Sequence, residues 1–243
     1  MPNYKMLIEY DGTDFCGWQV QNEERTVQGE IEHALEVLLK EHVRITAAGR
    51  TDSGVHALGQ IASFSCERQD LAEPGFLRSL NGLTGWDVVI HRIEPVSDDF
   101  NARFSAVARQ YSYHIAKTQI AVGRKYAHHC FFSLEVDVLN DLSQRLLGTH
   151  NFEAFAKPDP NEKHYLCHVD QISWSEENGQ IVFRIRANRF LRHMVRRLVG
   201  TLLHVAQGKM SKHDFLLMVE QQKNKNLCFT APSKGLFLEK VYY

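Results

Sequence analysis

The sequence has no long hydrophobic run, no low-complexity segment and few cysteines. No stretch approaches the roughly 18 apolar residues that a membrane-spanning helix needs, so no membrane contact is predicted. The first residues run straight into a strand-like pattern, without the layout of a signal peptide. Five dispersed cysteines, an odd number, do not suggest a disulfide framework. A cytoplasmic protein with reduced thiols is expected.

The amino-acid composition is that of an ordinary globular protein. The chain has 243 residues, of which 44% are hydrophobic, 23% charged and 10% aromatic. These values exclude the disordered, collagen-like and coiled-coil classes. The length allows one large domain or two domains of roughly 100–150 residues, each able to bury its own core.

Charge is distributed unevenly along the chain, although the net charge is only −1. Residues 1–100 hold 8 Lys and Arg against 17 Asp and Glu, whereas residues 101–243 hold 20 against 12. The segment 181–197 carries six arginines and no acidic residue. This asymmetry predicts a polyanionic partner bound mainly by the second half, the alternative being a solvated basic face.

Hydrophobic periodicity predicts an α+β fold of two similar halves, each a mainly antiparallel sheet with packed helices. The division is expected in the loop 94–101, giving an N-terminal half 1–100 and a basic C-terminal half 101–243. Strands are expected at 3–10, 43–48, 59–65, 88–93, 108–116, 172–175, 181–188 and 235–243. Helices are expected after Thr26 and at 77–83, 134–147 and 212–221. A long helix with Leu191 to Val205 on one face is expected to stop near Gly208.

The segment 49–57, GRTDSGVHA, is the sharpest candidate for chemistry. Two glycines bracket a loop between expected strands, so the backbone can turn there and present Asp52 at its tip. A carboxylate beside arginine and hydroxyl groups keeps a low pKa and can act as a nucleophile or as an electrostatic partner. Taken alone, the same residues also describe an ordinary capped turn.

Six segments in order, spread over nearly the whole chain, resemble the signature motifs of the TruA family of tRNA pseudouridine synthases. They are YDGTDFCGWQ (10–19), GRTDSGVHA (49–57), FNARF (100–104) with RQYSY (109–113), GTHNFEAF (148–155), FLRHMVR (190–196) and APSKGL (231–236). The resemblance implies the pseudouridine synthase fold and an isomerase that needs no cofactor.

The resemblance also implies roles for individual residues. Asp52 matches the catalytic aspartate of the family, and Arg196 matches an arginine that forms an ion pair with it. Tyr111 matches the active-site tyrosine that lies against the target base, whereas Tyr113 is expected in the core. Arg50 is a candidate for holding the nucleic-acid backbone or filling the gap left by an extruded base. Apart from the resemblance, the basic segment 181–197, which has no acidic residue, makes Arg192 and Arg197 candidates for phosphate contact.

By the same resemblance, the expected substrate is uridine at positions 38–40 in the anticodon stem-loop of tRNA. A homodimer whose two clefts are shared between subunits is also expected, although an acidic and a basic half could pair within a monomer. Two other functions stay open at this point. One is a catalytically silent RNA-binding protein on the same fold, and the other is a hydrolase that uses Asp11 or Asp52, with or without a metal.

Three further clusters contain residue types found in metal sites. Asp11 and Asp14 lie three residues apart beside a glycine, an arrangement that a tight turn explains more simply. The segments 128–130 and 164–168 contain histidines and a cysteine, but neither has the paired-cysteine spacing of a structural zinc site. No metal is predicted.

Overall fold

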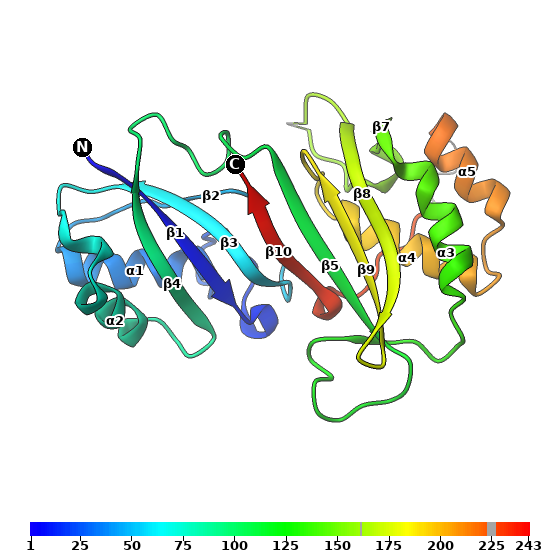
Figure 1. Cartoon of the computed structure of the whole chain (residues 1–243), viewed down its shortest axis with the longest axis horizontal. Helices are drawn as coiled ribbons and strands as arrows, with labels where there is room; N and C mark the ends of the chain where they lie inside the picture. The colour runs from blue at the N-terminus through cyan, green and yellow to red at the C-terminus, as the bar shows by residue number, and fades with distance from the viewer. Residues whose placement is uncertain (161, 223–226) are drawn as a thin grey trace. The chain divides into compact units, whose positions relative to one another are not determined.

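The computed structural model describes residues 1–160, 162–222 and 227–243. It divides the chain into two compact units, which are described separately (Figure 1). Unit 1 comprises residues 1–107 and 237–243, and unit 2 comprises residues 108–236. Each unit combines a mainly antiparallel sheet with packed helices, so the predicted α+β pseudouridine synthase fold is confirmed.

Unit 1 is built on the strand order β4-β1-β3-β10, with the short β2 paired to β3. Strand β1 is antiparallel to both β3 and β4, whereas β10 runs parallel to β3. The elements are β1 (Asn3–Tyr10), α1 (Val27–Leu39), β2 (Thr46–Ala47), β3 (His56–Ser65), α2 (Pro74–Leu83), β4 (Val88–Val96) and β10 (Leu236–Tyr242).

The core of unit 1 follows from the two-residue period of its strands and the helical period of α1. Every second residue of β1, from Tyr4 to Tyr10, is buried, while the residues between them are partly exposed. Thr26 caps α1, since its hydroxyl accepts a hydrogen bond from the Gly29 N–H. The buried face of α1 includes Ile31 and Leu35, which are 0% exposed.

Unit 2 is built on the strand order β5-β9-β8-β7, with β6 parallel to β5. Its hairpin β8–β9 turns at Asn178 and Gly179, both of which have positive φ angles, as the sequence predicts. The elements are β5 (Ala108–Ala116), β6 (His128–His129), α3 (Val136–Ser143), β7 (Gly148–Asn151), β8 (Leu166–Glu177), β9 (Gln180–Ala187), α4 (Met194–Ala206) and α5 (Lys212–Gln221).

A few specific contacts fix the helices of unit 2 on its sheet. The indole N–H of Trp174 on β8 donates to Ser143 Oγ at the end of α3, at 2.9 Å. The Asn140 side chain pairs with both backbone groups of Trp174, at 2.8 and 2.9 Å. Trp174 also packs on Phe183 of β9, with 4.7 Å between ring centroids. These contacts join α3, β8 and β9 into one core.

The structure differs from the sequence prediction at several element ends and in the division of the chain. The expected strand 43–48 is ordered as a strand only at Thr46–Ala47, and the helix expected from 134 begins at Val136. The last strand, expected in the second half, pairs with β3 of unit 1. Periodicity identifies a strand but not its partner, so a strand at the far end of the chain could not be assigned from sequence.

None of the helices among the described residues is long and apolar enough to span a bilayer. All five cysteines are free thiols. Burial raises the pKa of the Cys130 and Cys167 thiols to about 11.

Candidate active site

The loop 49–55, which carries Asp52, connects β2 to β3 in unit 1. A tight turn forms its tip, because the Val55 N–H donates to the Asp52 carbonyl at 3.1 Å. Gly54 has a φ of +73° within this turn, a conformation that glycine adopts at no steric cost. Asp52 is partly exposed, and Arg50 and Ser53 beside it are exposed. The loop thus presents its carboxylate at a surface.

The neighbouring segment 10–18 fastens this loop at three points. The Trp18 N–H donates to the Thr51 carbonyl at 3.1 Å. The Phe15 carbonyl accepts the Gly54 N–H at 3.3 Å and the Ser53 hydroxyl at 3.2 Å. Because these bonds involve main-chain atoms on both sides of Asp52, they fix the backbone from which its carboxylate projects.

Two glycines explain how the segment 10–18 comes so close to the loop. A Cβ at Gly12 would lie 2.0 Å from the Val55 carbonyl oxygen, so only glycine fits there. A Cβ at Gly17 would lie 2.8 Å from the Thr51 oxygen, and Gly17 has a φ of +89°. Two motifs far apart in sequence therefore form one structural unit, and the glycines in the first motif serve the loop in the second.

Buried polar side chains support the start of the loop. The Tyr10 hydroxyl, at the end of β1, lies 2.7 Å from Thr51 Oγ1. Gln60 on β3 is 0% exposed and donates from Nε2 to the Gly49 carbonyl at 2.8 Å. Burial raises the pKa of Tyr10 to about 12, so its hydroxyl stays protonated and available as a donor at neutral pH.

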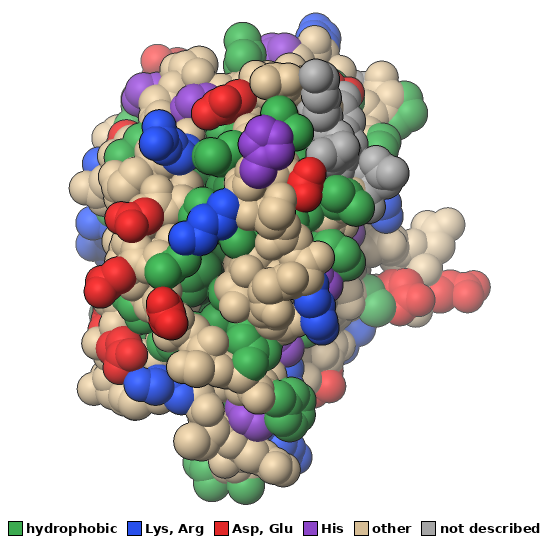
Figure 2. Space-filling model, turned by 90° about the vertical axis from the view of Figure 1, so that its right-hand side faces the viewer, with side chains coloured by type: hydrophobic (Ala, Val, Ile, Leu, Met, Phe, Trp, Pro, Cys, Tyr) green, Lys and Arg blue, Asp and Glu red, His purple; other side chains and the backbone are tan. Residues whose placement is uncertain are grey.

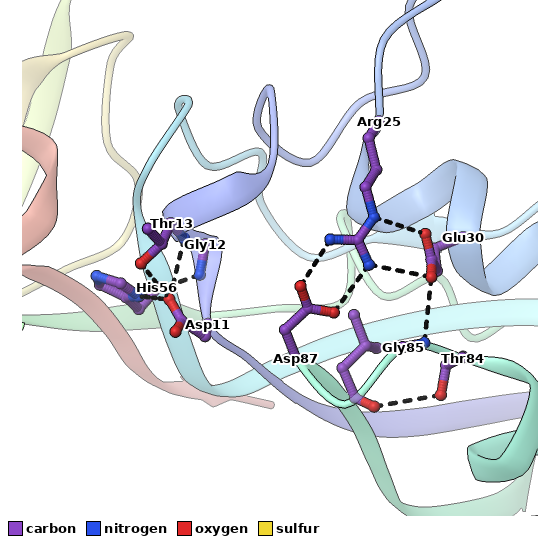
Figure 3. A network of polar contacts seen from close by, with 10 residues as sticks. Asp11, Gly12, Thr13, Arg25, Glu30, His56, Thr84, Gly85 and Asp87 are labelled. Atoms are coloured by element: carbon purple, nitrogen blue, oxygen red, sulfur yellow. Dashed lines mark hydrogen bonds and ion pairs between the residues drawn. The ribbon is translucent and has the colours of Figure 1, made fainter. Parts of the chain in front are cut away.

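A second polar group lies under the other end of the loop (Figure 3). His56 is 1% exposed, and its Nδ1 lies 3.0 Å from both the Gly12 nitrogen and Asp11 Oδ1. A protonated Nδ1 donates to Asp11, whereas an unprotonated Nδ1 accepts from the Gly12 N–H. Asp11 also accepts from the backbone and hydroxyl of Thr13, at 3.0 and 2.6 Å. The turn interpretation of Asp11 is confirmed.

The residues predicted from unit 2 lie on β5, on α4 and in the segment that precedes α4. Tyr111 on β5 pairs with Ile185 of β9 and is 7% exposed. Its ring meets that of Phe190 edge-on, with 5.0 Å between centroids. Tyr113 is 0% exposed and donates its hydroxyl to the Pro232 carbonyl at 2.9 Å, and burial raises its pKa. The predicted core position of Tyr113 is confirmed.

Arg196 lies near the start of α4 and is fixed by the segment that contains Ala231. Its Nε donates to the Ala231 carbonyl at 2.9 Å, and its own carbonyl accepts the Ala231 N–H at 2.9 Å. The next residue, Pro232, is the one held by Tyr113. Gly200, one turn along α4, allows this segment to approach, because a Cβ there would lie 2.5 Å from the Phe229 oxygen. The Arg196 side chain and backbone are therefore held in place within unit 2.

The arginine-rich segment 181–197 is less free than its sequence suggests. Arg184 forks onto Glu177, Arg186 pairs with Asp170 at 2.8 Å, and Arg189 pairs with Glu162 at 2.7 Å. The three acids lie on β8 and in the segment that precedes it, outside residues 181–197. The composition of 181–197 alone therefore does not reveal these ion pairs. On the face shown in Figure 2, Lys and Arg side chains are accordingly interspersed with Asp and Glu.

The remaining candidate arginines differ in how they are placed. Arg192 is exposed and has no acidic partner among the described residues, so it remains available for a phosphate. Arg197 donates to the Ala156 carbonyl and is partly exposed. Arg50, on the Asp52 loop of unit 1, is exposed. Of the predicted substrate-binding arginines, Arg50 and Arg192 are exposed and Arg197 is partly exposed.

The histidine and cysteine clusters make other contacts. Over residues 1–160, 162–222 and 227–243, no group of three His, Cys, Asp or Glu side chains is arranged to hold a metal ion. The His168 ring lies 2.9 Å from Thr149 Oγ1, and His164 lies 3.3 Å from Arg189. His129 packs on Phe131.

Comparison with known proteins identifies the family to which these motifs belong. A family model described as tRNA pseudouridine synthase matches residues 6–105 and 142–243. The chain belongs to the tRNA pseudouridine synthase family. Its members are isomerases, so the expected family and enzyme class are confirmed.

Similarity to curated members of this synthase family extends over the full length. Proteins called tRNA pseudouridine synthase A from Chlorobium phaeovibrioides, Aquifex aeolicus and Listeria monocytogenes are 41%, 39% and 39% identical to this chain. The matches cover 99% or more of this chain and of each relative. Among solved structures, a chain of a Cbf5-Nop10-Gar1 complex matches 82% of this chain and 53% of its own length, with 10% identity and a TM-score of 0.33.

Burial of the Tyr10 hydroxyl, which raises the pKa of Tyr10, makes its contribution to the stability of this synthase depend on pH. The folded-state pKa of Tyr10 is about 12, against 10.0 for an ordinary tyrosine, so its contribution is complete below pH 10 and is lost as the pH rises toward 12. We expect Tyr10→Phe to lower the free energy of unfolding by about 1–2 kcal/mol at pH 8, because Thr51 Oγ1 loses its buried partner. Urea unfolding at pH 8 and pH 11 measures both effects. A difference between wild type and variant that does not shrink at pH 11 would contradict a burial-raised pKa of Tyr10.

Proposed function

We propose that this chain converts uridine to pseudouridine at positions 38–40 in the anticodon stem-loop of tRNA, with Asp52 as the catalytic carboxylate and without a cofactor. The observation that carries the proposal is the Asp52 loop, whose backbone is fastened on both sides by the segment 10–18. The full-length similarity to proteins called tRNA pseudouridine synthase A supports the reaction and the substrate.

The reaction balances without an external reagent. The N1–C1′ glycosidic bond breaks, the uracil turns, and a C5–C1′ bond forms. The proton that leaves C5 is matched by one that N1 gains, so the product has the mass of the substrate. An ionised Asp52 carboxylate can stabilise positive charge at C1′, add to C1′ covalently or remove a sugar proton. All three roles need a charged oxygen held in a fixed position, which is what the fastened loop supplies.

We propose catalytic roles for Tyr111 and Arg196 as well, on the basis of the motifs that contain them. The Tyr111 ring has an aromatic face suited to an extruded uracil, and its hydroxyl suits proton transfer. The Arg196 guanidinium is always charged and planar, which suits a carboxylate partner. The ion pair between Arg196 and Asp52 stays a prediction. A double-mutant cycle on the free energy of unfolding, with Arg196→Gln and Asp52→Asn, measures this coupling.

Substrate binding is proposed to rest on Arg50, Arg192 and Arg197 together with Tyr111. A uridine in a stacked stem or loop must be turned out of the helix before its C1′ and C5 are accessible. Phosphate contacts position the RNA and dominate affinity, while a stacked base contributes selectivity. Arg192 suits phosphate contact because it is exposed and has no acidic partner among the described residues. Arg50 lies on the Asp52 loop itself, which suits it to hold the RNA backbone or to fill the gap left by the extruded uridine.

We also propose that the enzyme acts in the cytoplasm and is a homodimer. Five free thiols fit a reducing compartment. Sedimentation at micromolar protein is expected to give about twice the 28.0 kDa mass of the chain. A monomer that still modifies tRNA would overturn the shared-cleft dimer while leaving the reaction itself in place.

Replacing Asp52 by asparagine is expected to abolish turnover without unfolding the protein. The asparagine side chain keeps the shape of aspartate but lacks the charge, so release of tritium from C5-labelled uridine in tRNA should fall by several orders of magnitude. The thermal midpoint should barely change, because main-chain atoms fasten the loop. Affinity for tRNA should persist, since phosphate contacts supply most of it.

Asp14→Asn is the matched control, because Asp14 is an exposed aspartate on the segment that fastens the loop. It removes the same charge from the same unit and should leave tritium release near the wild-type rate. A folded Asp52→Asn variant that releases tritium as fast as Asp14→Asn would refute Asp52 as the catalytic carboxylate. A wild-type protein that binds tRNA but releases no tritium would instead favour the RNA-binding or hydrolase alternatives.

Arg192 is expected to contribute to the salt dependence of tRNA binding more than a paired arginine does. Arg192→Gln should reduce the slope of log affinity against log salt by about 0.7–0.9, the value for one phosphate contact. Arg184→Gln removes the same charge from an arginine already forked onto Glu177 and should reduce the slope less. Titrations between about 50 and 200 mM salt measure both slopes. Equal slopes for the two variants would mean that Arg192 faces solvent in the complex.

A further inference from the structure

We propose that Arg25 is a positioning residue for the Asp52 loop and acts on it through Phe15. The inference rests on the proposed function, because it takes Asp52 as the catalytic group. Arg25 lies just before α1, outside the segments 10–19 and 49–57 that resemble the family motifs.

The Arg25 guanidinium is fixed by two carboxylates (Figure 3). It forks onto Asp87, at 2.6 Å from Nη1 to Oδ2 and 2.9 Å from Nη2 to Oδ1. It also donates to both oxygens of Glu30, from Nε and Nη2, at 3.1 Å each. Glu30 Oε1 in turn accepts the Gly85 N–H at 3.1 Å. With four charge-assisted bonds to two carboxylates, the guanidinium plane has one preferred orientation, and these bonds raise the pKa of Arg25.

That orientation places the guanidinium over the ring of Phe15, at 4.1 Å from its centroid. Phe15 is 2% exposed, so the guanidinium covers a ring that is otherwise buried. The Phe15 carbonyl is the group that accepts both the Gly54 N–H and the Ser53 hydroxyl of the loop. Arg25 therefore holds the ring of Phe15 in place. The main chain of Phe15 in turn holds Ser53 and Gly54, the two residues after Asp52.

The backbone on either side of Arg25 makes the same connection. The Cys16 N–H donates to the Arg25 carbonyl at 2.9 Å, and the Val27 N–H donates to the Gly17 carbonyl at 3.3 Å. The residues 15–18 are thus enclosed between the start of α1 and the Asp52 loop. A shift of the Arg25 side chain is transmitted to the loop through this short path of packed atoms.

Neither a lysine nor a neutral side chain can replace this arginine. A lysine is a point charge that cannot fork onto Asp87, reach Glu30 and lie flat on a ring at the same time. A neutral side chain leaves Asp87 and Glu30 close together without a cation between them, and the two carboxylates then repel each other. Loss of the guanidinium is therefore expected to release Phe15.

Arg68 provides a matched control in the same unit. It forks onto Asp70, and its guanidinium lies 5.1 Å from the ring centroid of Phe76. Phe76 belongs to α2 rather than to the segment that fastens the Asp52 loop. Arg68→Gln thus removes an arginine with the same kind of ion pair and the same kind of ring contact, outside the proposed path.

The experiment compares Arg25→Gln, Arg25→Lys and Arg68→Gln in the full-length enzyme. Amide hydrogen exchange of the peptide covering 49–57, without tRNA, reports the loop directly, and steady-state kinetics report its catalytic effect. In Arg25→Gln we expect exchange of this peptide to be several-fold faster and kcat to fall about 10- to 100-fold, with KM unchanged, because misplacement of a catalytic group costs rate more than binding. Arg25→Lys should behave similarly, and Arg68→Gln should match wild type in both.

The two readouts separate this inference from the proposed function. If Asp52→Asn is inactive and Arg25→Gln matches Arg68→Gln in either loop exchange or kcat, the positioning role of Arg25 is overturned while catalysis by Asp52 stands. If Asp52→Asn is active, the proposed function itself fails, whatever the exchange data show. A proportional fall of kcat and of the folded fraction in Arg25→Gln, measured by circular dichroism, would also overturn the inference, because it shows stability loss alone.

Discussion

The close approach of the segment 10–18 to the Asp52 loop is the constraint on which the candidate site depends. A loop that presents a carboxylate at a surface has no core of its own, so its conformation must be imposed from outside. Here main-chain hydrogen bonds from Phe15 and Trp18 impose it, and Gly12 and Gly17 leave the space in which those bonds can form. Without these two glycines the loop would have to move away from the residues that define it.

A similar design fixes Arg196 in unit 2. Both the side chain and the main chain of Arg196 are hydrogen-bonded to Ala231. Pro232, which follows Ala231, accepts a hydrogen bond from Tyr113 in the core. Gly200 and Gly235 allow the backbone of this segment to pass close to α4 and to Tyr113. In both units, a candidate catalytic group therefore projects from backbone that a distant segment of the same unit holds.

Sequence alone predicts the parts of this account that depend on local pattern. Periodicity gives the bounds of β1, β5 and α5, and the motifs identify Asp52 and the family. It does not give interactions between segments far apart in the chain. The pairing of β10 with β3 and the fork of Arg25 onto Asp87, 62 residues away, follow from tertiary packing that no local window contains. For the same reason, the sequence alone overestimates how many arginines of the segment 181–197 lack an acidic partner.

We propose that this chain converts uridine to pseudouridine in the anticodon stem-loop by means of its own side chains. The most direct measurement incubates the purified protein with an unmodified tRNA transcript, with and without a chelator, and maps pseudouridine at every nucleotide. We expect conversion at positions 38–40 with no change in the mass of the tRNA, and an unchanged rate with the chelator. Pseudouridine at other positions, a change in RNA mass, or a reaction that the chelator stops would contradict it.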